Sequence, residues 1–229
     1  LTHFEAAIRE TQRWVDSPMA GQSELGAQTD TDVRREALVD LIYCYTQERK
    51  PETAVAYIRK NAYRRGVYVA ALERLASRLS TMDQAAGAAE TARELLRLAP
   101  DTPDRVDDAA MLYSAIKKTK RYDEVGDDID LISRAFLRQI RKPNSPKETR
   151  DRQLEELEAY MRDLATISQE ALNKLPKTAK ERPVFARQVA RAYRIHVDTF
   201  PNNENSLAML ENLVDVLVLS DDDFNAGRR

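Results

Sequence analysis

The sequence predicts an all-α protein built from consecutive helix pairs, an α-solenoid. Apolar residues recur at steps of three and four along most of the chain, the spacing that keeps one face of a helix apolar. Only 6 of the 229 residues are Gly and 9 are Pro, and Ala, Leu, Arg and Glu dominate, which favours helices. One pair of short helices buries little surface, so similar pairs are expected to stack on each other.

The stretch 68–100 shows the helix-pair pattern most clearly. Residues 80–83, Ser-Thr-Met-Asp, supply helix-capping residue types between its two helices. Pro100 closes the pair because proline cannot continue a helix. The apolar positions are Leu72, Leu75, Ala76 and Leu79 in the first helix, and Ala85, Ala88, Ala89, Ala92, Leu95 and Leu96 in the second.

The remaining helices are bounded by turn residues. Pro51 suits the first turn of a helix, and Gly66 suits the C-terminal end of that same helix. The stretch 17–31, with its Gly, Ser and Asp residues, is expected to be a flexible loop. The expected helices are 1–15, 32–48, 53–65, 103–118, 122–140, 147–175, 184–200 and 206–219.

The longest expected helix, 147–175, carries a heptad-like apolar seam between two proline-bounded joints. Two interpretations of this seam stay open. It packs on flanking helices of the same chain, or it mediates self-association, with Leu154, Leu157, Met161 and Leu164 as the contact residues. The full seam consists of Leu154, Leu157, Met161, Leu164, Ser168, Ala171 and Leu175.

Composition argues against several classes of protein. The chain has 36 Lys and Arg against 38 Asp and Glu, a formal net charge of −2, so no general attraction to nucleic acid or to an anionic membrane is expected. No apolar run approaches the roughly 18 residues of a membrane span, and we expect no direct membrane insertion. The single cysteine, Cys44, allows no internal disulfide.

A repeat relates the helix pairs to one another. Ala54 and Ala88, early in two successive second helices, are 34 positions apart, and Val125 follows 37 positions later. A helix–turn–helix period of 34 is typical of tetratricopeptide repeats (TPRs), and the chain resembles this family most clearly over about 32–136. The family has a small residue where this chain has Tyr113, so the ring is expected to widen the helix packing there.

The TPR resemblance implies a binding surface. In that family the first helices of the pairs line a concave face on which peptides or extended segments bind. The residues placed on that face by analogy are Tyr43, Gln47, Glu73, Ser77, Ser114, Lys117 and Lys118. The family's basic, asparagine-rich clamp for C-terminal carboxylates is not recognisable at these positions, so capture of chaperone tails is not expected.

No constellation of residues predicts catalysis, a cofactor or a metal. His3 and His196 lie far apart, with no cysteine or paired carboxylate at ligand spacing. No glycine-rich phosphate loop and no nucleophile elbow occurs. We therefore expect no enzyme activity, no cofactor and no metal site in this chain.

One basic–aromatic cluster leaves a second interpretation open. Such a mixture can bind single-stranded nucleic acid, whereas the simpler interpretation is a solvated helix face whose long side chains cover apolar surface. The cluster consists of Tyr57, Arg59, Lys60, Tyr63, Arg64, Arg65 and Tyr68.

Five segments are expected along the chain. They are a second helix of a truncated repeat at 1–16, the loop at 17–31, TPR-like repeats at 32–140, the long helix with its joints at 141–183, and a truncated TPR-like helix pair at 184–229. The expected function is a protein–protein interaction scaffold, a segment of a larger bacterial protein. The alternatives are a recruiting or regulatory arm of an enzyme whose catalytic part lies outside this chain, and an RNA-binding helical repeat.

Overall fold

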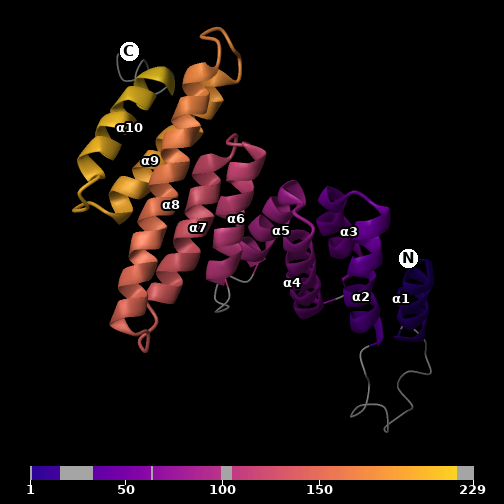
Figure 1. Ribbon diagram of the computed structural model, residues 1–229. Helices are drawn as coiled ribbons and strands as arrows, with labels where there is room; N and C mark the ends of the chain where they lie inside the picture. The colour runs from indigo at the N-terminus through magenta and orange to yellow at the C-terminus, as the bar shows by residue number, and fades with distance from the viewer. Residues whose placement is uncertain (1, 16–32, 63, 99–104, 221–229) are drawn as a thin grey trace. The chain divides into compact units, whose positions relative to one another are not determined.

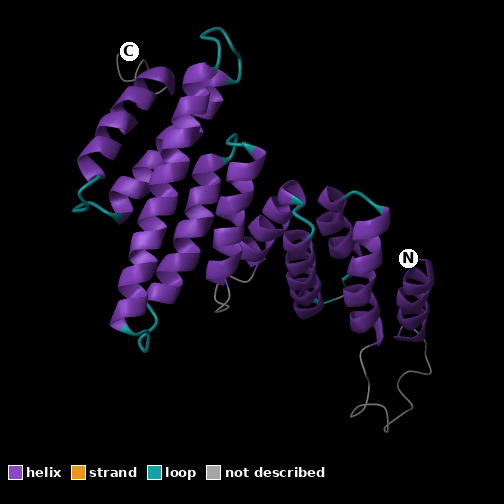
Figure 2. Ribbon diagram, in the orientation of Figure 1, coloured by secondary structure: helices purple, strands orange, loops and turns teal. Residues whose placement is uncertain are grey.

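The computed structural model describes residues 2–15, 33–62, 64–98 and 105–220, and side chains are described within these ranges except at 11–15, 33–34 and 220. All regular structure in these residues is helical, and no strand occurs among them (Figure 2). The chain divides into two compact units, Leu1–Leu98 (unit 1) and Ala99–Arg229 (unit 2). The predicted all-α fold is therefore confirmed.

Unit 1 contains five α-helices and one short 3-10 turn among its described residues (Figure 1). They are α1 (Thr2–Val15), α2 (Val33–Glu48), η2 (Pro51–Thr53), α3 (Ala54–Asn61), α4 (Arg65–Thr81) and α5 (Ala85–Leu98). Each helix packs on its chain neighbour, α1 on α2, α2 on α3 and α4 on α5. In addition, α2 packs beside α4 and α3 beside α5.

The core of unit 1 follows the apolar stripes of the sequence. On α2 and α4 every stripe residue is at most 6% exposed: Leu38, Leu41, Ile42, Tyr45, Leu72, Leu75, Ala76 and Leu79. Pro51 opens the turn that leads into α3, as predicted, and Thr53 Oγ1 and Tyr45 Oη lie 2.8 Å apart there. Burial of these faces, at roughly 25 cal/mol per Å² of apolar surface, is the main force that holds the pairs together.

The predicted boundary at Gly66 is wrong. The helix expected over 53–65 ends at Asn61, because Ala62 is already extended at ψ 122°. Arg64 is extended as well, with φ −143° and ψ 149°, and it forms the N-terminal cap position of α4. Gly66 consequently lies in the first turn of α4 instead of ending the preceding helix.

Unit 2 contains five α-helices among its described residues. They are α6 (Arg105–Thr119), α7 (Val125–Ile140), α8 (Lys147–Lys174), α9 (Arg182–Thr199) and α10 (Ser206–Ser220). Chain neighbours again pack together, and α7 also packs beside α9 and α6 beside α8 (Figure 1). The 28 residues of α8 confirm the long helix that was predicted near 147–175.

Contacts between alternate helices give both units the same organisation. In unit 1 the first helices, α2 and α4, lie side by side, and so do the second helices, α3 and α5. In unit 2 the equivalent contacts join α6 to α8 and α7 to α9. Stacked helix pairs make such contacts, and this arrangement is consistent with TPR-like repeats. The division into five segments stays a prediction, and its loop at 17–31 lies outside the described residues.

Candidate protein-binding site

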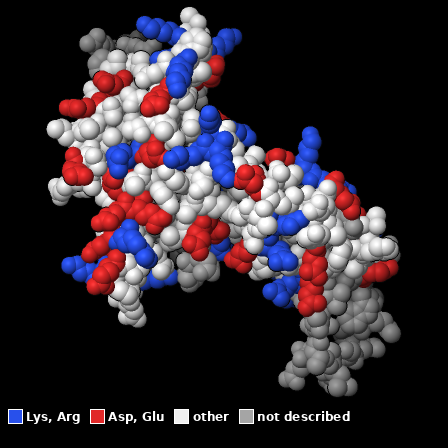
Figure 3. Space-filling view, viewed as in Figure 1, with Lys and Arg blue, Asp and Glu red and all other residues white. Residues whose placement is uncertain are grey.

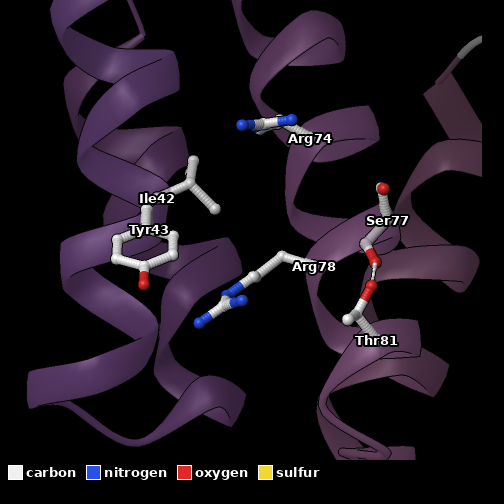
Figure 4. A pocket seen from close by; sticks show the side chains of 6 residues that line it. All are labelled: Ile42, Tyr43, Arg74, Ser77, Arg78 and Thr81. Carbon is white, nitrogen blue, oxygen red and sulfur yellow. Dashed lines mark hydrogen bonds between the residues drawn. The ribbon is translucent and has the colours of Figure 1, made fainter.

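A cavity of about 220 Å³ lies between α2 and α4 of unit 1 (Figure 4). Both helices belong to the layer of first helices, on which the TPR resemblance places the binding face. We call this cavity the α2–α4 pocket. It is lined by Ile42 and Tyr43 from α2, and by Arg74, Ser77, Arg78 and Thr81 from α4.

The helical register explains why these side chains meet. The four lining positions of α4 are separated by three, one and three residues, so they share one face of the helix. This face borders the buried stripe that contains Leu75 and Leu79. On α2, Tyr43 directly follows the buried Ile42 and is turned to the edge of the core, where its side chain is 55% exposed. The pocket therefore lies at the edge of the core that α2 and α4 share.

Arg78 holds a fixed position in the pocket. Its guanidinium carbon lies 4.4 Å from the centroid of the Tyr43 ring, in a cation–π arrangement. Its Nε donates to Oγ1 of Thr46 over 3.4 Å, and the Thr46 hydroxyl is bound to the carbonyl groups of Ile42 and Tyr43. These contacts orient the guanidinium but do not neutralise its charge.

Arg74 completes a pair of cationic groups. Figure 4 shows the guanidinium groups of Arg74 and Arg78 extending from α4 toward α2. Within the described part of the chain, no ion pair joins either arginine to a carboxylate. Guanidinium groups bind carboxylates through paired, charge-assisted hydrogen bonds. The pocket can therefore receive an anionic group beside an exposed aromatic ring.

The structure brings two of the seven predicted face residues together. Tyr43 and Ser77 line the α2–α4 pocket. Gln47 and Glu73 are exposed on the same two helices, but they do not line the cavity. Arg74 and Arg78 were not among the predicted residues, although both lie within one turn of Ser77 and could have been found from that spacing.

The other three predicted residues lie on α6 in unit 2, where Ser114, Lys117 and Lys118 are all exposed. Nζ of Lys117 lies 2.7 Å from Oδ2 of Asp163 and donates to the Tyr113 hydroxyl over 3.1 Å. These hydrogen bonds raise the pKa of Lys117 above its ordinary value. Because Lys117 already forms an ion pair within the chain, it is less available than Arg74 to bind an incoming anion.

The apolar seam of α8 faces its own chain. Leu157, Met161 and Leu164 are completely buried, while Leu154 is half-buried. Only the half-buried Leu154 is thus left accessible for the self-association that was considered. The seam also differs from its predicted course at the C-terminal end, where Leu172 is buried and Ala171 is not. An α-helix has 3.6 residues per turn, so a strict heptad drifts around it by about 20° every seven residues.

Three residues of the basic–aromatic cluster bind carboxylates within unit 1. Arg59 lies 2.6 Å from Glu94, and the Tyr68 hydroxyl donates to the same carboxylate over 2.8 Å. The Tyr57 hydroxyl donates to Glu5, and burial together with that carboxylate raises the pKa of Tyr57 to about 12. Figure 3 shows Lys and Arg interspersed with Asp and Glu on the visible face. These contacts favour a structural role for the cluster.

Two other kinds of feature do not occur among the described residues. No group of three or more His, Cys, Asp or Glu side chains in the described ranges is arranged to hold a metal ion. Within the same ranges, none of the helices combines the length and the apolar character that crossing a membrane requires.

Comparison with known proteins gives one match at the level of structure. No protein-family model matches the sequence, and no curated protein does. A solved structure from Podosopora anserina, described as kinesin light chain nearly identical TPR-like repeats, aligns with 96% of this chain and 98% of its own length. The two share 13% sequence identity with a TM-score of 0.34. Because the similarity is so low, the fold assignment depends on the helix packing described above and not on this match.

Proposed function

We propose that this chain is a protein-interaction scaffold and that the α2–α4 pocket of unit 1 binds an acidic side chain of a partner protein. One observation carries the proposal. Arg74 and Arg78, neither of which pairs with a carboxylate among the described residues, share a cavity with the exposed ring of Tyr43. An Asp or Glu side chain fits the two guanidinium groups, and an aliphatic neighbour in the same peptide fits Ile42 and the face of the tyrosine.

Short fluorescent peptides that carry a single Glu between aliphatic residues test this proposal by fluorescence anisotropy. The full chain is expected to bind them and to bind the matched Gln peptides more weakly. Arg74→Ala and Arg78→Ala each remove a hydrogen bond to a charged group, so each is expected to weaken binding roughly tenfold. Arg78→Lys keeps the charge but loses the planar fork, and an intermediate affinity is expected.

Arg97→Ala is the matched control, because Arg97 is an exposed arginine on α5, in the other helix layer of unit 1. Its affinity for the Glu peptides should equal that of the unchanged chain. Equal binding of the Glu and Gln peptides, or full binding by the double variant of Arg74 and Arg78, contradicts the proposal. Tighter binding of a single-stranded RNA than of any peptide assigns the pocket to phosphate instead.

A further inference from the structure

The last described helix, α10, carries a second, separate apolar surface. Six large apolar or aromatic side chains are strongly exposed among the described residues, and four of them lie on α10. These four are Leu207, Leu210, Val214 and Val218, with exposed fractions of 68%, 45%, 55% and 61%. Their spacing of three, four and four places them in one line along the helix. We call this line the α10 stripe.

The α10 stripe is not the core face of a helix that points away from the core. The opposite side of α10 supplies Met209, Leu213 and Val216, which are at most 7% exposed, and α10 packs on α9 (Figure 1). The helix is therefore apolar on two sides, of which α9 covers one. A helix that is apolar on two sides is typically buried on both. The side that no described element covers thus has the composition of an interface.

On α10 itself, the charged residues beside the stripe are all acidic. Among its 15 residues α10 has only two charged ones, Glu211 and Asp215, and both are exposed. At 100° per residue, both acidic residues follow the same edge of the stripe, next to Leu207 and Val214. No Lys or Arg occurs anywhere on α10. The surface is thus an apolar line with one acidic edge.

This acidic edge discriminates between occupants of the stripe. In an antiparallel pairing of two copies, the two-fold axis brings both acidic edges to the same side of the contact, where like charges repel each other. An anionic membrane surface is repelled by the same carboxylates. A helix with its own apolar line and Lys or Arg along the facing edge gains ion pairs with Glu211 and Asp215.

We propose that the α10 stripe docks a basic amphipathic helix from a partner protein. The partner helix lies along α10, inserts its apolar residues between Leu207, Leu210, Val214 and Val218, and places its cationic residues against Glu211 and Asp215. This mode of recognition is helix-on-helix packing with i, i+3, i+4 and i+7 anchors. It uses a different unit and a different chemistry from the α2–α4 pocket, so it holds or fails independently of that site.

Two designed helical peptides with the same leucine line test the proposal against the full chain by fluorescence anisotropy. One peptide carries Lys along the edge of its apolar line, and the other carries Glu at those positions. The Lys peptide is expected to bind at least about tenfold more tightly than the Glu peptide, and added salt should narrow this difference. The double variant Glu211→Lys with Asp215→Lys is expected to invert the preference.

Val214→Glu places a charge in the middle of the stripe and is expected to abolish binding of the Lys peptide. Val184→Glu is the matched control, since Val184 is also 55% exposed but lies on α9, and it should leave binding unchanged. The proposal is overturned if neither peptide binds, if both bind equally, or if Val214→Glu still binds. It is also overturned if light scattering shows dimers that Val214→Glu dissolves, or if vesicles of neutral lipid bind in preference to the peptide.

Discussion

Tyr113 and Tyr160 stack face to face, with ring centroids 3.9 Å apart and ring planes 8° apart. The first ring belongs to α6 and the second to α8. Phe136 of α7 meets the Tyr160 ring edge-on, at 5.8 Å and 85°. The three rings therefore join the first three helices of unit 2. A bulky residue at position 113, where the TPR resemblance implies a small one, is accommodated by a partner ring on the next first helix.

Replacing Tyr160 should show the stabilising contribution of this stack. Tyr160→Ala removes both ring contacts and is expected to lower the free energy of unfolding by roughly 3 kcal/mol. Tyr160→Phe keeps the rings and loses only the hydrogen bond to Glu156, so a loss below about 1 kcal/mol is expected. Urea unfolding followed by circular dichroism measures both. Equal losses for the two variants would mean that the stack contributes little.

The buried seam of α8 gives a second prediction. Met161→Ala opens space in a completely buried position, and a loss of about 2–5 kcal/mol in the free energy of unfolding is expected. Leu154→Ala removes a half-buried side chain from the same helix and should cost clearly less. Light scattering should give the same molar mass for both variants and for the unchanged chain. A change in oligomeric state on replacing Met161 would contradict its burial within a single chain.

Sequence patterns predict the helices and their buried faces well, because helix periodicity and burial are local properties. Leu72, Leu75 and Leu79 are all completely buried, as their spacing indicated. Boundaries are harder to predict, as Gly66 shows, because an extended residue such as Arg64 can begin a helix without any cap-type side chain. Only two of the six residues that line the α2–α4 pocket were predicted. Tyr43 and Ser77 followed from the TPR resemblance, whereas the lack of a carboxylate partner for Arg74 and Arg78 among the described residues depends on contacts between helices.

Replacement of two helical glycines, Gly126 and Gly66, by alanine is expected to change stability in opposite directions. A Cβ on Gly126 of α7 would lie 2.7 Å from the backbone oxygen of Gln188 on α9, and the Gly126 amide donates to the Gln188 side chain over 3.0 Å. Gly126→Ala must push α9 away, and a loss of about 1–3 kcal/mol in stability is expected.

Gly66→Ala is the matched change in α4, where nothing lies within 4 Å of the added Cβ. Alanine is a better helix former than glycine by about 1 kcal/mol, so Gly66→Ala should leave stability unchanged or raise it by up to that amount. Thermal unfolding of the two variants in parallel checks the contrast. Stabilisation by Gly126→Ala would contradict this close approach of α7 and α9.

His196 and Glu158 give the chain a dependence of stability on pH. Nε2 of the completely buried His196 lies 3.1 Å from Oε1 of Glu158, and its Nδ1 meets no hydrogen-bond partner among the described residues. Burial lowers the pKa of His196 below its ordinary 6.5, although Glu158 opposes this shift. Burial disfavours the charge of Glu158, but hydrogen bonds from Arg162 and His196 outweigh it and hold its pKa below 4.5.

Both shifts act in the same direction on acidification. Below pH 6.5 the unfolded chain protonates its histidine before the folded chain does, so the free energy of unfolding falls with pH down to the folded pKa of His196. The contribution of Glu158 is present above pH 4.5 and is lost as pH falls through its lowered folded pKa. His196→Gln keeps a neutral donor for Glu158 without a titrating ring. Urea unfolding at about pH 7.5 and about pH 5.5 should therefore show a smaller loss of stability for this variant than for the unchanged chain. An equal loss in both proteins would mean that the histidine titrates normally in the folded state.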